Sequence, residues 1–127
     1  MTTDQKQVAV VIEDNEDNMV LITRLLRKAG YEALWAETGK KGVTYTVEHH
    51  PDFVILDIQL PDINGTEVLN RIRALDGDIA NVPIIAMTSY AMAGDKEKLL
   101  AAGCNGYIEK PIDPMLVISQ IRKILEG

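Results

Sequence analysis

The sequence of residues 52–65 is DFVILDIQLPDING. Its four consecutive apolar residues, 53–56, are typical of a strand that is buried on both faces of a parallel sheet. The apolar run ends at Asp57, and Pro61 and Gly65 indicate that the chain then leaves the sheet in a loop. Open α/β sheets bind ligands at the carboxyl ends of their central strands, so Asp57 is a candidate functional residue.

The composition is that of an ordinary globular protein with an acidic balance. Of the 127 residues, 46% are apolar and 25% are charged, which allows a single domain over residues 1–127 with its own core. The formal net charge of -6 excludes the basic footprint expected for binding nucleic acid or an anionic membrane. With neither a membrane span nor the apolar region of a signal peptide, the chain is expected to be cytoplasmic. The single cysteine, Cys104, is expected to be a small buried residue.

Strand and helix patterns alternate along the chain. The first helix is expected to begin at a cap, Asp14 or Asn15, and to end at Gly30. The alternation predicts an α/β domain in which a doubly wound, five-stranded parallel sheet carries helices on both faces. The predicted strands are residues 8–12, 31–36, 53–56, 84–87 and 106–108, and the predicted later helices are residues 38–50, 64–75, 95–102 and 113–125.

Residues 38–50 fit two patterns. Val43, Tyr45 and Val47 alternate with threonines, which is a strand pattern, whereas Val43 and Val47 also fit one face of a helix. Because the strands on either side are expected to be parallel, the segment between them must be a crossover. We therefore predict a helix here.

Polar side chains follow four of the five predicted strands, and parallel strands bring their carboxyl ends to one edge of the sheet. Glu13 and Asp14 follow the first strand, Asp57 the third, Thr88 the fourth and Lys110 the fifth. Taken singly, such a residue is usually a helix cap, a loop residue or a solvated charge. A converging set of three carboxylates, a hydroxyl and an ammonium is much less expected by chance.

The chemistry of this set points to phosphoryl transfer. Crowded carboxylates repel one another unless a cation lies between them, and Mg²⁺ is the cation that takes carboxylate and phosphate oxygens together. Lys110 and Thr88 suit phosphate oxygens, the first as a charge and the second as a donor. A carboxylate nucleophile beside a metal and a phosphoryl group predicts covalent phosphorylation of an aspartate.

These residues also match a known family. The chain resembles the receiver domain of two-component response regulators over nearly its whole length, and the resemblance implies the flavodoxin-like strand order 2-1-3-4-5. The matching motifs are VVIEDN at residues 10–15, DIQLPDING at 57–65, MTS at 87–89 and YIEKP at 107–111.

The resemblance assigns roles at the metal. Asp57 would be the phosphoacceptor, and Glu13, Asp14, the Asp57 carboxylate and the backbone carbonyl of Gln59 would hold Mg²⁺. Gln59 and Tyr90 are expected to flank the path of attacking water and to tune the lifetime of the phosphoryl group. The domain would assist its own phosphorylation and dephosphorylation without being an enzyme in the usual sense.

The resemblance also assigns a switch. Lys110 would pair with the phosphoryl group, Thr88 would move to hydrogen-bond it, and Tyr107 would turn inward when Thr88 moves. The Lys110–Pro111 bond would be cis. The phosphoryl donor would be a sensor histidine kinase or a histidine phosphotransfer protein, and a downstream protein would dock on the face formed by residues 95–125.

Three other readings compete with the receiver. A haloacid-dehalogenase-type phosphohydrolase uses a similar set but needs an acid two residues after the nucleophile, where Gln59 cannot titrate. A flavodoxin-like or dinucleotide-binding module is disfavoured because residues 13–17 are acid-rich and lack GxGxxG. A receiver fold kept only for docking is disfavoured by the complete acid, threonine and lysine set. His49 and His50 are not expected to donate a phosphoryl group, since they precede the third strand, away from the acidic edge.

Overall fold

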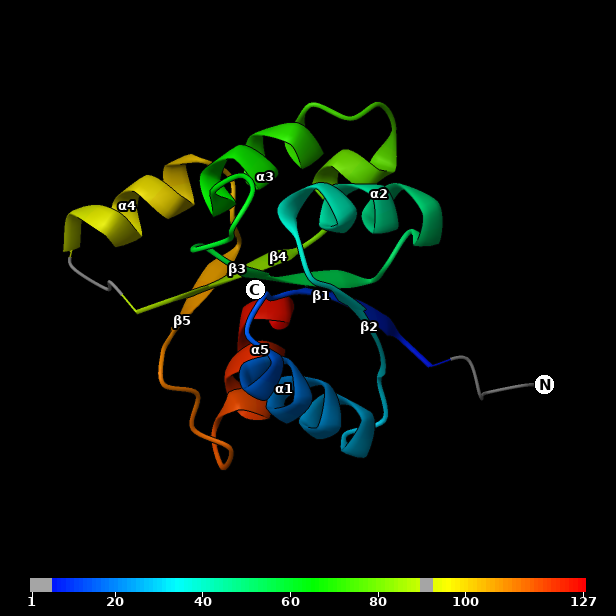
Figure 1. The fold of residues 1–127 in the computed structure, drawn as a ribbon, viewed down its shortest axis with the longest axis vertical. Coiled ribbons are helices and arrows are strands. Elements are labelled where there is room, and N and C mark those ends of the chain that lie inside the picture. Colours follow the sequence, from blue (N-terminus) through cyan, green and yellow to red (C-terminus); the bar gives the residue numbers. More distant parts are fainter. Residues whose placement is uncertain (1–5, 90–92) are drawn as a thin grey trace.

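The computed structural model describes residues 6–89 and 93–127, with backbone only for residues 93–95 (Figure 1). Five parallel strands form one sheet in the order β2-β1-β3-β4-β5, which confirms the predicted doubly wound topology. Helices α2, α3 and α4 cover one face and α1 and α5 the other (Figure 1). The strands are β1 Val8–Ile12, β2 Glu32–Ala36, β3 Phe53–Asp57, β4 Ile84–Thr88 and β5 Gly106–Glu109.

The helices begin where the sequence supplies capping side chains. Asn15, Thr38 and Asn64 precede α1, α2 and α3, and each side chain accepts a hydrogen bond from a backbone N–H in the first turn. The helices are α1 Glu16–Lys28, α2 Gly39–His49, α3 Gly65–Arg73, α4 Ala93–Ala101 and α5 Val117–Glu126, and a 3₁₀ turn, η1, covers Asp78–Asn81.

The core lies in two layers, one on each face of the sheet. Alternate strand residues enter opposite layers: Val11 and Ile55 face α1 and α5, whereas Val10 and Val54 face α2 and α3. Every residue of β3 is buried, as expected for the central strand of a covered parallel sheet. This burial fixes Asp57, the last residue of β3, at the edge where the strand leaves the core.

Helix α2 confirms the helix predicted for residues 38–50. Val47 is 43% exposed, and the buried positions are Gly39, Gly42 and Thr46. A Cβ atom on Gly42 would lie 2.3 Å from Cδ1 of Ile12, so α2 packs against β1 more closely than any larger residue permits. Gly42 thus lets α2 approach β1, and Val43 packs partly buried against the same core layer.

Helix α5 begins later than predicted, at Val117 instead of Asp113. The backbone carbonyl of Asp113 accepts from the N–H groups of Leu116 and Val117, and its side chain accepts from the N–H of Met115. These bonds close a turn ahead of the helix, a role that aspartate and Pro114 suit. Among the residues that the structure describes, no helix is long and apolar enough to cross a membrane.

Candidate functional site

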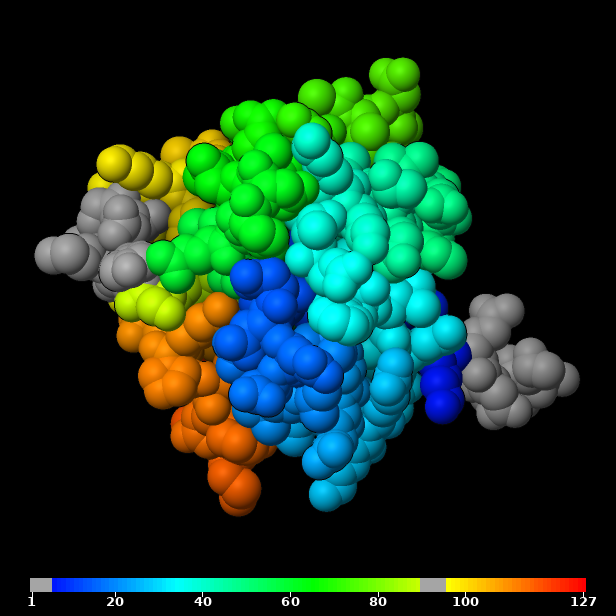
Figure 2. Space-filling model, in the orientation of Figure 1, coloured from blue at the N-terminus to red at the C-terminus, as the bar shows by residue number. Residues whose placement is uncertain are grey.

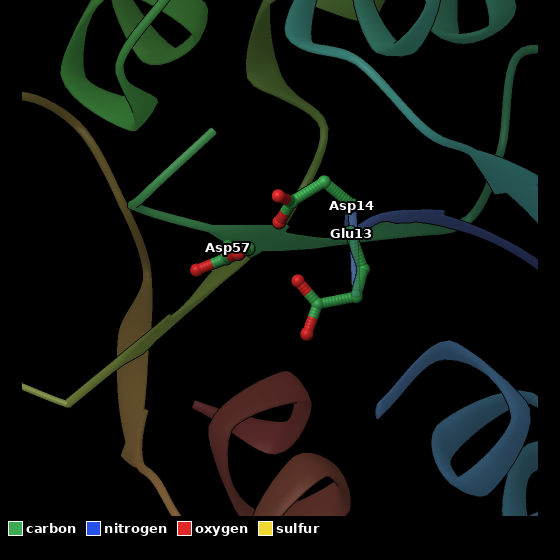
Figure 3. A group of neighbouring side chains, drawn as sticks. All are labelled: Glu13, Asp14 and Asp57. Atoms are coloured by element: carbon green, nitrogen blue, oxygen red, sulfur yellow. The ribbon is translucent and has the colours of Figure 1, made fainter. Parts of the chain in front are cut away.

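Three carboxylates meet at the carboxyl edge of the sheet. Glu13 and Asp14 follow β1 and Asp57 ends the neighbouring β3, and an oxygen of each lies within 4.8 Å of the others. Figure 3 shows the three side chains converging on one space. Glu13 is 0% exposed and Asp57 is 2% exposed, whereas Asp14 is exposed, so the group opens to solvent on the Asp14 side.

Lys110 brings a positive charge to this group from edge strand β5, which is two strands away from β3. It follows β5, and its Nζ lies 3.0 Å from Oδ1 of Asp57 and 3.3 Å from Oε1 of Glu13. The side chain is only 13% exposed, so the ammonium is held against the two buried carboxylates. The Lys110 ammonium thus contacts two of the three carboxylates. With three carboxylates and this one ammonium, the site carries an excess of negative charge when the acids are ionised.

The protonation of the site follows from burial and proximity. Burial, followed by hydrogen bonding to Asp57 and its charge, raises the pKa of Glu13 to about 7. Burial also acts to raise the pKa of Asp57, but hydrogen bonds with Glu13 and the Gln59 N–H, together with the Lys110 ammonium, outweigh it and lower that pKa. Desolvation opposes the charge of Lys110, yet both acids raise its pKa. Of the two buried acids, Asp57 is therefore the one that is kept ionised.

Backbone contacts hold the two buried acids in place. The N–H of Gln59 donates to Oδ1 of Asp57 at 3.1 Å, on the same oxygen that Lys110 contacts. The indole N–H of Trp35, on edge strand β2, donates to the backbone carbonyl of Glu13 at 2.6 Å. Sequence reasoning assigned Trp35 only to a strand, because nothing in its neighbours indicates a partner 22 residues away.

The remaining predicted residues lie around this group. Thr88 ends β4 beside β3 and is buried. Tyr107, on β5, is half-buried, and Nζ of Lys96 lies 5.0 Å from its ring centroid and 3.1 Å from Oε1 of Glu109. The Lys110–Pro111 bond is cis. Tyr90 lies outside the described residues.

The donor set fits a hard divalent cation. All three side chains offer carboxylate oxygens, which Mg²⁺ and Ca²⁺ prefer. Oε2 of Glu13 is buried and has no hydrogen-bond partner among the described residues, although a buried carboxylate oxygen normally has one. A cation at this position would neutralise the excess charge and lower the pKa of Glu13. His49 and His50 are exposed and precede β3, at the opposite edge of the sheet.

Similarity to known proteins identifies the family of this chain. The profile of the response regulator receiver domain matches residues 9–122. The chain belongs to this receiver family. The polar-differentiation response regulator DivK of Brucella ovis is 39% identical over 116 residues, which are 91% of this chain and 94% of DivK.

Solved structures agree with the fold of this receiver. The receiver domain of a sensor histidine kinase from Pseudomonas aeruginosa PAO1, with a magnesium ion coordinated in its active site cleft, has a TM-score of 0.86 and 30% identity and covers 97% of this chain and 100% of its own. The chemotaxis response regulator CheY4 of Vibrio cholerae has a TM-score of 0.88 at 21% identity, covering 94% and 99%, and supports the fold alone. Membership of the family fits a phosphorylation-dependent signalling switch.

Proposed function

We propose that this receiver accepts a phosphoryl group on Asp57 from a phosphohistidine of a sensor histidine kinase or histidine phosphotransfer protein. The observation that carries the proposal is the buried Asp57 carboxylate, kept ionised 3.0 Å from Lys110 and within 4.8 Å of the oxygens of Glu13 and Asp14. An ionised carboxylate fixed among charges that can stabilise a phosphoryl group is an activated nucleophile.

The reaction needs a nucleophile, a fixed positive charge and Mg²⁺. A carboxylate oxygen of Asp57 forms the new bond to phosphorus while the bond from phosphorus to the histidine nitrogen breaks, and the bonding electrons return to the imidazole. Mg²⁺ would supply charge neutralisation for the transferring oxygens and would be held by Glu13, Asp14, Asp57 and the Gln59 carbonyl. Lys110 would stabilise the phosphoryl group as a fixed charge.

The phosphoryl group would act as an electrostatic switch. It replaces one charge on Asp57 with roughly two and adds acceptor oxygens, by analogy with other phosphorylated side chains. Thr88, on the adjacent strand, is the hydroxyl donor we propose to move toward it, which leaves room for Tyr107 to turn inward. Tyr107 now lies under Lys96 of α4, so its movement would change the face that residues 95–125 offer to a downstream protein.

The test is the mass of the protein after exposure to a small phosphodonor with Mg²⁺. We expect a gain of one phosphoryl group, absent in Asp57→Asn and retained in Asp52→Asn. Asp52 is a matched control because it precedes β3 at the opposite edge of the sheet, where its Oδ2 accepts from the N–H of Val8. No gain in the wild type would refute the proposal, and continuous phosphate release without a gain would favour a phosphohydrolase.

A further inference from the structure

The loop after β3 makes a contact that the phosphoacceptor site does not explain. From this loop the carboxylate of Asp62 reaches the first turn of α2, where Oδ1 accepts from the N–H of Gly39 at 2.8 Å and Oδ2 from the N–H of Lys40 at 3.0 Å. Thr38 already caps the N–H of Lys41 from within the α2 segment, at 3.1 Å. Asp62 thus completes the capping of α2 from a segment more than 20 residues away.

The contact is a strong one for an exposed side chain. Desolvation opposes the charge of Asp62, but the backbone N–H groups of Lys40 and Gly39 lower its pKa to about 2. Its negative charge also lies at the positive end of the α2 dipole. The carboxylate is therefore ionised at neutral pH and can keep both contacts.

Packing beside the hydrogen bonds joins the same two segments. A Cβ atom on Gly39 would lie 2.6 Å from Cγ1 of Ile63 and 2.9 Å from Cγ2 of Val68, so the start of α2 touches the loop and α3 directly. Figure 2 shows the cyan residues at the beginning of α2 against the green residues that follow β3. The loop is consequently held at two places, by the N–H of Gln59 on Asp57 and by Asp62 on α2.

We propose that Asp62 is a positioning residue for the metal site, which anchors the loop of residues 58–64 to α2 and so fixes the backbone carbonyl of Gln59. Asp62 lies three residues after Gln59, and a backbone carbonyl can only ligate well if the loop carrying it is held still. The inference rests on the proposed function, because it assumes that Gln59 ligates Mg²⁺. If the inference holds, α2 is one of the elements that determine the affinity of the site for Mg²⁺.

Substitution of Asp62 tests this with a matched control. We expect Asp62→Ala to weaken Mg²⁺ binding by about fivefold, at the low end of typical coupling between sites, and Asp62→Asn, which keeps one acceptor oxygen, to lie between it and the wild type. Asp52→Ala removes the same kind of carboxylate-to-backbone bond at the other edge and should leave Mg²⁺ binding unchanged. The titration can be followed by the fluorescence of Trp35, which is bonded to the Glu13 carbonyl.

Hydrogen exchange on the wild type provides a second readout that does not depend on a variant folding. Coupling is reciprocal, so Mg²⁺ binding should slow exchange of the Gly39 and Lys40 amides and leave the Val8 amide, bonded to Asp52, unaffected. A wild type that does not bind Mg²⁺ would overturn the proposed function and this inference together. A wild type that binds Mg²⁺ with unchanged exchange at Gly39 and Lys40, or an Asp62→Ala variant with wild-type affinity, would overturn the inference alone.

Discussion

Two cations in this receiver, Lys110 and Arg73, each contact several acceptors at once, but their partners differ in kind. The Lys110 ammonium lies between two carboxylates at the carboxyl edge of the sheet. Arg73, at the end of α3, donates all five of its N–H groups to neutral acceptors at 2.8 to 3.0 Å. Its acceptors are the carbonyls of Ala80, Val82 and Gly103 and the side chain of Asn105.

The difference separates a structural centre from a reactive one. Every donor of Arg73 is satisfied, so its guanidinium ties α3, η1 and the α4–β5 turn together and has no capacity for a new ligand. At the other centre the Lys110 ammonium is shared between Glu13 and Asp57. The pKa of Glu13 is raised to about 7, and its Oε2 has no hydrogen-bond partner among the described residues. Because the polar groups of this site lack a full set of hydrogen-bond partners, they can bind a cation and a phosphoryl group.

The largest effect on stability is expected from replacing Arg73, whose N–H groups are all hydrogen-bonded. Arg73→Met should lower the free energy of unfolding by roughly 3 to 5 kcal/mol, because several loop carbonyls lose charged donors at once. Urea denaturation measures this. The folded fraction of the variant should still gain a phosphoryl group, since Arg73 contacts nothing in the acidic site; loss of phosphorylation in folded protein would break the distinction between the two centres.

The next effect is a dependence of stability on pH that arises at the reactive centre. The pKa of Glu13 is about 7 in the folded protein against an ordinary 4.5, so between these pH values the folded state binds the extra proton. The free energy of unfolding of the metal-free protein should therefore fall as pH rises through this range, by roughly 2 to 3 kcal/mol. The lowered pKa of Asp57 acts below its ordinary 3.8, outside this window. Thermal melts in chelator should show the slope, and Glu13→Gln should remove it.

A smaller effect is expected from the metal itself. At ten times its dissociation constant, Mg²⁺ should stabilise the wild type by about 1.4 kcal/mol through mass action, and chelator should reverse the gain. At one fixed Mg²⁺ concentration the gain should be larger at pH 8 than at pH 6, because Glu13 must lose its proton to bind and the dissociation constant therefore falls as pH rises. Melting curves of Asp57→Asn supply the control, with a reduced gain; an equal gain in that variant would place the metal elsewhere.

The smallest effect is expected for a third cation. Lys41 lies only 2.6 Å from Glu37, but both side chains are about half exposed and the pair is screened by water. Lys41→Ala should leave the urea midpoint within experimental error of the wild type. A clear destabilisation would show that a short distance between the charges determines how much a cation stabilises this molecule, and not its burial or a full set of hydrogen bonds.

The fold was largely predictable because its signals are local. Apolar runs located β1, β3 and β4, and Asn15, one of the two caps predicted for the first helix, precedes α1. The close contact of α2 with Ile12 could not be predicted, because it requires glycine at position 42, which no periodicity of apolar residues reveals. The start of α5 was misplaced because the turn at Asp113 competes locally with the helix.

The site was predictable only as far as topology brings strand ends together. Parallel strands place Glu13, Asp57 and Lys110 at one edge whatever their exact distances, so the set could be inferred from order alone. The bonds of Trp35 to Glu13 and of Asp62 to α2 join side chains to distant backbone groups. Backbone groups are the same at every position, so no sequence pattern identifies which of them a side chain will meet.

Whether Asp57 is the phosphoacceptor can be decided by locating the phosphoryl group on the chain. The protein is incubated with Mg²⁺ and a small phosphodonor, the acyl phosphate is trapped with borohydride, and the modified residue is found by tandem mass spectrometry. We predict modification at Asp57, with none in Asp57→Asn. Trapped modification of another carboxylate, with Asp57 unmodified, would contradict this assignment.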